Sequence, residues 1–182
     1  MSRNILLVTN ASRESAIDAF WEAADLLQRH GLNPISIEED FQEMTKTGTE
    51  LEVYKDQEIE LALVLGGDGT ILRAAESLRG HNVPILGLNL GHVGFMAEAE
   101  REDMPEIISR IADRNYSTSA RMALEVEVYS GKDKVFSSWA LNEVALEKSS
   151  REKILEVAIE VDSRPISSFG CDGVVFSTPT GS

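Results

Sequence analysis

The sequence predicts an α/β fold with a doubly wound parallel sheet, followed by an incomplete all-β region. In the first part of the chain, short apolar runs alternate with stretches of helical periodicity, a pattern typical of parallel strands with helices on both faces of the sheet. Beyond Tyr116 the apolar residues recur at every second position between turn-forming residues, which indicates antiparallel strands. We therefore predict an α/β domain over residues 1–117 and a partial all-β domain over residues 118–182.

The first predicted unit is a strand followed by an amphipathic helix. Residues 4–9 form an apolar run that is typical of a buried strand. A helix is expected over residues 13–30, with Ser12 as its N-cap and Gly31 as its C-terminal stop. Its apolar residues recur at helical spacing on one face and are Ile17, Phe20, Ala24 and Leu27.

The rest of this domain repeats the alternation. Strands are expected over residues 34–37, 59–65 and 83–88, and helices over residues 71–78 and 102–114. Residues 38–56 are polar and acidic, and we interpret them as a solvated loop or lid. Because parallel strands place their carboxyl ends at one edge of the sheet, the loops after the third and fourth strands are expected to open toward the same side.

The loop after the third strand carries the strongest chemical signal. Residues 66–70 read Gly-Gly-Asp-Gly-Thr and lie between an apolar strand and a helix. Glycines let a phosphate approach the main chain, and the helix N-terminus offers unpaired N–H groups. A carboxylate disfavours simple anion capture there, so Asp68 fits a group that holds a metal ion or takes a proton from a nucleophile. Two plainer interpretations stay open: a tight glycine turn, or Asp68 as a helix N-cap.

The second half of the chain has the pattern of an antiparallel β region. Strands are expected over residues 124–129, 135–141, 155–161 and 173–176, with turns at residues 130–133 and 162–165. In isolation, Asn142-Glu143 and the Cys171-Asp172-Gly173 triplet read as ordinary turns. The sequence ends within a Gly/Thr-rich loop over residues 177–182, beside a β layer with open edges. On this pattern we interpret the chain as a fragment.

Composition narrows the classes of function. The 17 Lys and Arg residues against 31 Asp and Glu give a net charge of −14, which disfavours a general nucleic-acid binder. An anionic nucleotide can still be bound through main-chain N–H groups, a few basic side chains and Mg²⁺. No apolar run approaches the ~20 residues that span a bilayer, and the start of the chain leads directly into a strand without a signal peptide. Cys171 is the only cysteine, so no intrachain disulfide can form and a cytoplasmic setting fits.

Four motifs occur in a characteristic order along the chain. They are the Gly66–Thr70 loop, the segment from Asn89 to Phe95, Asn142-Glu143, and the segment from Asp172 to Ser182 with its Thr-Pro-Thr-Gly-Ser ending. This series closely resembles the ATP-NAD kinases of the bacterial type, over nearly the whole chain. Lipid kinases share the first motif, but the later motifs are more specific to NAD kinases.

The resemblance implies roles for individual residues. Asp68 matches the catalytic general base, which would activate the adenosine-ribose 2′-hydroxyl of NAD. Phosphate binding falls to the loop residues Gly66, Gly67, Gly69 and Thr70. The positions implied for NAD binding are Asp68, Gly69, Leu72, Arg73, Phe95, Asn142, Glu143, Lys153 and Asp172. Among them, Asn142 and Glu143 match the pair that holds adenine and ribose, and Asp172 is in some members contributed across a subunit interface.

The resemblance also implies the reaction and its partners. The expected activity is that of an NAD kinase, with ATP and Mg²⁺ or another divalent cation as donor complex and NAD as substrate, in an α/β nucleotide-binding domain and a partial NAD-binding β domain. The full-length protein is expected to form a dimer or tetramer and to bind small nucleotides, not nucleic acid or membranes. The alternatives are a non-catalytic nucleotide-binding fragment and a lipid kinase of the same superfamily.

Overall fold

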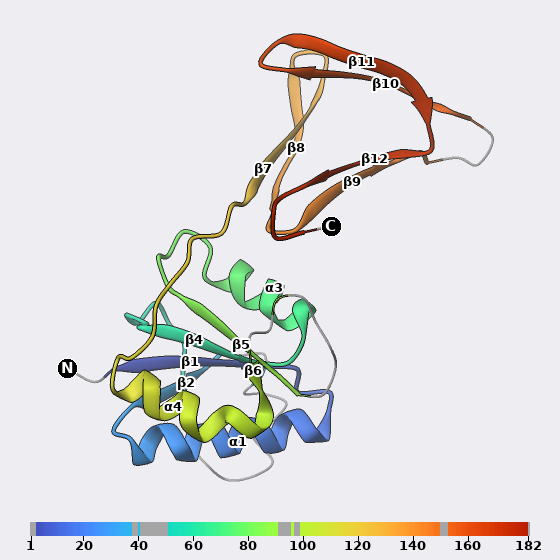
Figure 1. The fold of residues 1–182 in the computed structure, drawn as a ribbon. Coiled ribbons are helices and arrows are strands. Elements are labelled where there is room, and N and C mark those ends of the chain that lie inside the picture. The colour runs from blue at the N-terminus through green and yellow to red at the C-terminus, as the bar shows by residue number, and fades with distance from the viewer. Residues whose placement is uncertain are drawn as a thin grey trace. The chain divides into compact units, whose positions relative to one another are not determined.

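The structure, a computed structural model, describes residues 3–37, 40, 51–90, 96, 99–149 and 153–181. The chain divides after Thr118 into two compact units. Figure 1 shows helices and strands in the first unit and strands alone in the second. None of the described helices is long and apolar enough to cross a membrane.

Six parallel strands form the sheet of the first unit; the parallel sheet was predicted, with four of these strands. They are β1 (Asn4–Thr9), β2 (Asn33–Ser36), β3 (Glu52–Val53), β4 (Leu61–Leu65), β5 (Ile85–Asn89) and β6 (Ala99–Glu100). Their order across the sheet is β3-β2-β1-β4-β5-β6, and every neighbouring pair is parallel. The order reverses between β1 and β4, whose carboxyl ends are level because Thr9 pairs with Leu65. In doubly wound sheets, ligands bind outside the strand ends near such a reversal.

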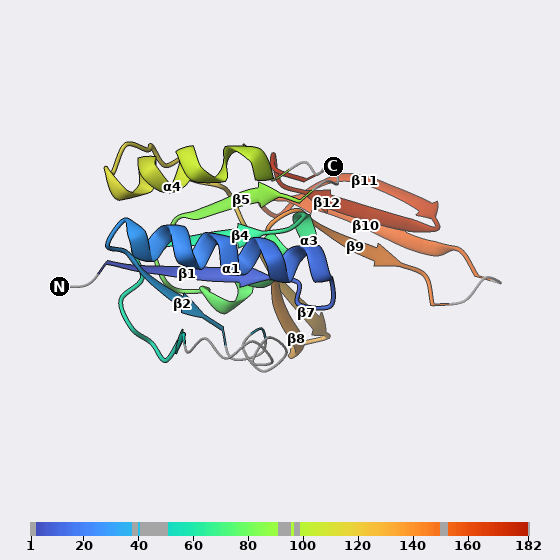
Figure 2. The ribbon, with the colours of Figure 1, turned by 90° about the horizontal axis from the view of Figure 1, so that it is seen from below.

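Helices cover both faces of this sheet. They are α1 (Glu14–Arg29), α3 (Asp68–Ser77) and α4 (Met104–Ala112), the last preceded by the 3₁₀ turn η2 (Arg101–Asp103). Figure 2 shows α1 and α4 in front of the strands, and α3 packs on the opposite face. The apolar face predicted for the first helix is the face that packs on the strands.

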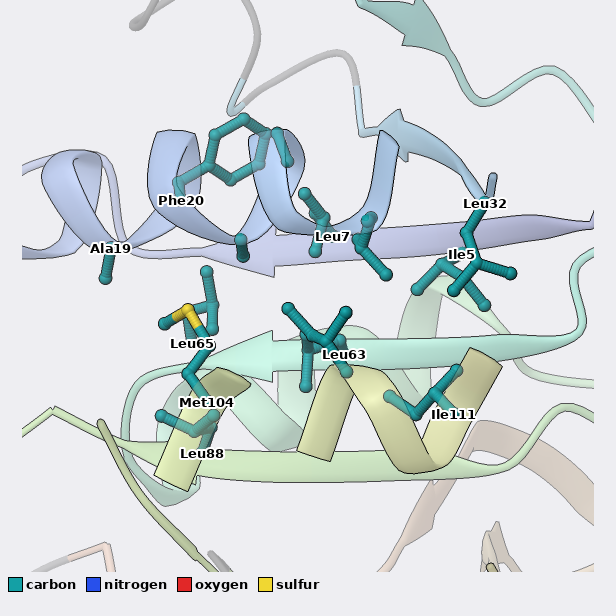
Figure 3. Close-up of a cluster of buried hydrophobic side chains, with 14 of the residues drawn as sticks. Ile5, Leu7, Ala19, Phe20, Leu32, Leu63, Leu65, Leu88, Met104 and Ile111 are labelled. Atoms are coloured by element: carbon teal, nitrogen blue, oxygen red, sulfur yellow. The ribbon is translucent and has the colours of Figure 1, made fainter. Parts of the chain in front are cut away.

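Alternate residues of the central strands β1 and β4 contribute to two separate hydrophobic clusters. Ile5 and Leu7 of β1 join the cluster under α1 and α4, which includes Phe20 and Met104 (Figure 3). The residues between them, such as Leu6, join the cluster under α3. Because fully burying a large apolar side chain stabilises a fold by about 1.5–3 kcal/mol, this two-sided burial holds the sheet edge that carries the glycine loop.

An ion-pair network joins the amino ends of the strands to the end of α4. The guanidinium of Arg3 donates from Nε to Glu60 Oε2 at 2.7 Å and from Nη2 to Glu60 Oε1 at 2.5 Å. It also donates to the carbonyls of Ile111 and Ala112 at the last turn of α4. The hydroxyl of Tyr116 donates to Glu60 Oε1 at 3.2 Å. The network lies at the opposite edge of the sheet from the glycine loop.

The second unit consists of three antiparallel strand pairs, as the period-two pattern predicted. β7 (Leu124–Ser130) pairs with β8 (Asp133–Ala140), β10 (Leu155–Val161) with β11 (Arg164–Cys171), and β9 (Glu143–Glu147) with β12 (Gly173–Ser177). Among the described residues of this unit no apolar side chain is buried. Large apolar side chains are instead exposed on several strands: Tyr129, Val135, Phe136, Leu146, Ile166, Phe169, Val175 and Phe176.

Several predicted boundaries were wrong. Residues 38–56 are not all solvated loop, because Asp40 and Leu51 are buried and β3 pairs with β2 inside this range; residues 38, 39 and 41–50 lie outside the described residues. The first helix has Arg13 at its N-cap position, whereas Ser12 donates its hydroxyl to Asn10. The two-residue strands β3 and β6 and the serine-containing strand β11 were not predicted, since such segments carry little apolar periodicity. Strand β9 was missed because Asn142-Glu143 was interpreted as a turn.

Candidate active site

A glycine turn leads from β4 directly into α3. Gly67 occupies the N-cap position and Asp68 is the first helical residue, so the helix begins three residues earlier than predicted. The Gly66 N–H donates to the Leu88 carbonyl of β5 at 3.0 Å, and the Thr70 N–H donates to the Gly67 carbonyl at 2.9 Å. The turn is thus tied to the sheet on one side and to the first turn of the helix on the other.

The three glycines of this turn have different surroundings. A Cβ atom on Gly66 would lie 2.6 Å from Thr70 Oγ1, so only glycine fits there without displacement. A Cβ atom on Gly67 or on Gly69 would meet no described atom within 4 Å. Gly66 therefore serves the turn itself, whereas Gly67 and Gly69 leave open space beside the N–H groups of a helix N-terminus, where an anion can approach.

The Asp68 carboxylate is half-buried at the entrance of α3. Its Oδ1 accepts a hydrogen bond from the main-chain N–H of Met96 at 3.1 Å. The alternative in which Asp68 is the N-cap is wrong, because Gly67 holds that position. One carboxylate oxygen is thereby fixed against the segment that follows β5, at the carboxyl edge of the sheet.

Arg73 lies farther along α3 and contacts the end of β1. Its Nη1 is 2.8 Å from Asp40 Oδ1, and its Nη2 donates to the Thr9 carbonyl. Asp40 is 2% exposed, and its Oδ2 accepts from the Thr9 N–H at 2.8 Å. The prediction missed Asp40 because it lies in an acidic run whose pattern is typical of solvated loops.

The structure describes some of the remaining predicted site residues of this unit and not others. Leu72 is 36% exposed on α3, and Asn89 ends β5 as a buried residue. Phe95 and the rest of the second glycine loop, residues 91–95, lie outside the described residues.

In the second unit, the Thr-Pro-Thr-Gly segment is bound to the corner between β8 and β9. Thr178 is 4% exposed. Its hydroxyl donates to the Leu141 carbonyl at 2.6 Å and accepts from the N–H groups of Thr180 and Gly181. The Thr178 N–H donates to the Asn142 carbonyl at 2.8 Å. A Cβ atom on Gly181 would collide with the main chain of Asn142. Two motifs that are far apart in the sequence thus meet here.

The side chain of Asn142 is incompletely paired. Its Oδ1 is shielded from solvent and has no hydrogen-bond partner among the described residues. Buried polar atoms are nearly always hydrogen-bonded in folded proteins, so this oxygen is suited to accept an N–H or O–H from a ligand. Glu143 is exposed beside it, at the start of β9.

The other two predicted NAD contacts lie away from this corner. Asp172 precedes β12, at the opposite end of the β9–β12 pair from Asn142, about 20 Å away by the rise of a strand. Its carboxylate, 83% exposed, forms an ion pair with Lys148. Lys153 is exposed ahead of β10. The structure therefore does not bring Asp172 and Asn142 together within one chain.

Comparison with known sequences identifies the family to which the chain belongs. Residues 5–116, more than half of the chain, match the ATP-NAD kinase N-terminal domain. Residues 141–182 match the ATP-NAD kinase C-terminal domain. The chain belongs to the ATP-NAD kinase family.

Curated relatives in this family are similar over the whole chain. The NAD kinase of Leifsonia xyli subsp. xyli is 46% identical over 187 residues, which cover 99% of this chain and 62% of that protein. NAD kinase 2 of Streptomyces coelicolor is 42% identical, again over 99% of this chain and 62% of that protein. The chain therefore spans less than two thirds of the length of these ATP-NAD kinases.

Solved structures share the fold at much lower identity. Yeast NADH kinase, complexed with NADH, has a TM-score of 0.87 at 20% identity and covers 98% of this chain and 58% of its own. An NAD kinase from Archaeoglobus fulgidus, in complex with ATP, has a TM-score of 0.62 at 21% identity and covers 96% of this chain and 60% of its own. These likenesses confirm the predicted ATP-NAD kinase architecture of α/β and β regions.

Proposed function

We propose that the protein containing this chain is an NAD kinase, which transfers the γ-phosphate of ATP to the 2′-hydroxyl of the adenosine ribose of NAD and so produces NADP. The observation that carries this proposal is the Asp68 carboxylate, held by the Met96 N–H at a helix N-terminus beside two open glycines. The two relatives named NAD kinases, at 46% and 42% identity, support the same reaction.

In this proposal Asp68 accepts the proton of the ribose hydroxyl as the hydroxyl attacks phosphorus. A general base must lie within hydrogen-bond reach of its proton, about 3 Å. The bond from Met96 fixes Oδ1, so the carboxylate presents a constant orientation to the substrate. Gly67 and Gly69 supply main-chain N–H groups that cradle the phosphates, at a turn that the Thr70 N–H closes by donating to the Gly67 carbonyl. In-line phosphoryl transfer depends mainly on such positioning and on neutralising charge.

A divalent cation fits this site as a partner of ATP. No group of three or more metal-ligating side chains occurs among the described residues. Mg²⁺ is commonly bound by one or two carboxylates together with substrate phosphates, and Asp68 is the carboxylate that lies at the phosphate-binding turn. When bound, the cation neutralises phosphate charge.

The second unit would bind the dinucleotide. We assign Asn142 and Glu143 to adenine and ribose, because Asn142 Oδ1 is a buried acceptor without a partner in the described part of the chain. Leu72 and Phe95 would contribute apolar contacts, and Lys153 and Asp172 the outer polar ones. Because Asp172 lies at the far end of β9–β12 from Asn142, we propose that it acts in the site of a second subunit.

Two wider expectations accompany this function. The full-length protein is proposed to be a homo-oligomer, a dimer or tetramer, and to work in the cytoplasm on small nucleotides without nucleic-acid or membrane partners. A lipid kinase is less well supported, since both units match NAD kinase domains. A nucleotide-binding role without catalysis is favoured for residues 1–182 alone by the exposed apolar strands of the second unit.

The test of this function is the Asp68→Asn variant of the full-length protein. With ATP, Mg²⁺ and NAD, the wild type is expected to produce NADP, and the variant to lose about 10²–10⁴-fold in kcat. The amide can still accept the Met96 N–H, so the thermal midpoint should change little. Unchanged turnover in the variant would remove Asp68 as the base, and a wild type that makes no NADP would refute the function itself.

A further inference from the structure

An ion pair with a buried carboxylate lies where the strand order of the sheet reverses. Asp40, at 2% exposed, is 2.8 Å from the Arg73 guanidinium, whose side chain is 33% exposed. Both groups reach the carboxyl end of β1, which is the strand next to β4 at the reversal. None of the sequence motifs includes Asp40.

The pair encloses the last residue of β1 from two sides. Asp40 Oδ2 accepts from the Thr9 N–H at 2.8 Å, and Arg73 Nη2 donates to the Thr9 carbonyl. The Thr9 hydroxyl in turn donates at 3.0 Å to the carbonyl of Leu65, the residue before Gly66. One chain of hydrogen bonds therefore leads from α3 through β1 to the end of β4.

This chain of bonds brackets the phosphate-binding turn. Leu65 enters the turn and Arg73 lies on the helix that leaves it, so residues 66–72 are tied at both ends to the same buried residue, Thr9. A carboxylate is costly to bury unless it is paired and hydrogen-bonded, and here both oxygens of Asp40 have partners. A buried pair contributes little net stability but fixes geometry well.

We propose that Asp40 is a positioning residue that acts through Arg73 to hold the Gly66–Thr70 turn and the Asp68 carboxylate in place, and that Arg73 serves this network rather than the nucleotide. The resemblance to NAD kinases implied a nucleotide contact for Arg73, whereas its guanidinium is engaged here by Asp40 and Thr9. The catalytic consequence rests on the proposed NAD kinase function. The structural consequence, an ordered turn, does not.

The experiment compares Asp40→Asn, Arg73→Gln and the double variant in the full-length protein. Misplacing a catalytic group by about 1 Å costs on the order of 100-fold in rate, so each single variant is expected to lower kcat about 10- to 100-fold. The KM values for NAD and ATP should stay within about threefold. The double variant should be no slower than the slower single variant, because both changes break one network. Arg29→Gln is the matched control, since it removes an Arg–Asp pair that lies exposed on α1.

A second measurement does not depend on activity. Amide hydrogen exchange of residues 66–72 is expected to quicken at least tenfold in Asp40→Asn and not in Arg29→Gln. If Asp40→Asn does not fold, Arg73→Lys provides the same comparison, because lysine keeps the charge but lacks the fork that reaches two acceptors. A wild type that makes no NADP would refute the proposed function, while the exchange comparison would still decide on the positioning role.

Two results would overturn the inference. One is unchanged exchange and unchanged kcat in Asp40→Asn. The other is a rise in KM for NAD or ATP of tenfold or more in Arg73→Gln, with no such rise in Asp40→Asn. That pattern would make Arg73 a direct nucleotide contact and Asp40 a bystander.

Discussion

Neighbouring glycines in one turn meet different physical demands. Gly66 has no room for a Cβ atom because Thr70 Oγ1 lies too close, whereas Gly69 has open space on the corresponding side. Space at Gly66 is taken by the protein itself. At Gly69 no described atom occupies the corresponding space, and in the proposed function the nucleotide phosphates approach there.

Substitution at these two positions should separate stability from activity. Gly66→Ala is expected to lower the free energy of unfolding by about 1–3 kcal/mol through overpacking. Gly69→Ala lies within α3 and should raise it by about 0.5–1 kcal/mol, because alanine is the better helix former, while NADP formation falls at least tenfold. Urea unfolding and steady-state kinetics measure the two effects. Full activity in a stable Gly69→Ala variant would contradict the phosphate-binding role.

Substitution of Asn142 should also separate stability from NAD binding. Its buried Oδ1 lacks a hydrogen-bond partner in the described chain. The Asn142→Leu variant replaces the amide with an apolar side chain of similar size, which needs no partner. The free energy of unfolding should therefore stay equal or rise. A lost hydrogen bond to NAD should raise the KM for NAD about 10-fold or more.

Thr178→Val is the contrasting variant, because it leaves the Leu141 carbonyl and the N–H groups of Thr180 and Gly181 unpaired. It should lower the thermal midpoint as well as activity. An Asn142→Leu variant that binds NAD normally would exclude Asn142 from the site.

At the scale of elements, buried or half-buried charged side chains lie at both ends of the parallel strands in the first unit. At the amino edge, Arg3 and Glu60 join β1 and β4 to the end of α4. The Arg3 guanidinium holds the pKa of the Glu60 carboxyl below its ordinary value, against the opposing effect of desolvation. Desolvation and the Glu60 charge raise the pKa of Tyr116.

This network predicts how stability depends on pH. A carboxyl whose folded-state pKa is lowered contributes stability above its unfolded pKa, about 4.3, and loses it as pH falls through the lower folded value. Glu60→Gln is therefore expected to cost about 1–3 kcal/mol at pH 7 and to flatten the decline in stability below about pH 4.5. Urea unfolding at several pH values measures this.

Glu106→Gln provides the matched control at this edge. Glu106 pairs with Arg110 on the surface of α4 at 3.7 Å, with both side chains more than half exposed. Its removal should change stability by less than about 0.5 kcal/mol. Equal effects from Glu60→Gln and Glu106→Gln would argue against the network as a stabilising element.

Elements differed in how well the sequence predicted them. Strand β1 and helix α1 were predicted nearly to the residue because burial against a sheet requires apolar periodicity. Asp40 could not be predicted, since its burial depends on Arg73 and Thr9, which lie far away in the sequence. The same holds for the contact between Thr178 and Asn142: both motifs were recognised, but their meeting depends on strand pairing.

At the scale of the whole molecule, the two units differ in how many apolar side chains they bury. The first unit has two buried clusters, whereas the described part of the second buries no apolar side chain and exposes Phe136, Ile166 and Val175 among others. The chain also spans 62% of the length of its curated relatives. Strand pairs without a covered apolar face are marginally stable in water.

Residues 1–182 on their own are therefore expected to have little NAD kinase activity. NADP formation by this chain should be at least 100-fold below that of the full-length protein at equal concentration, because the Asn142 corner would be loosely held. Limited proteolysis should cleave the second unit first and leave a fragment close to residues 1–118. Robust turnover by the 182-residue chain would show that the exposed strands suffice.

The hydrogen bond between Thr178 and Leu141 also determines the order in which parts of the chain can fold during synthesis. It spans 37 positions, so the corner that carries Asn142 cannot close until the β10–β11 hairpin and β12 have been synthesised. At about 5–20 residues per second, Thr178 leaves the ribosome several seconds after Thr118 completes the first unit. During translation, the turn around Asp68 can thus fold before the corner proposed to bind the dinucleotide is formed.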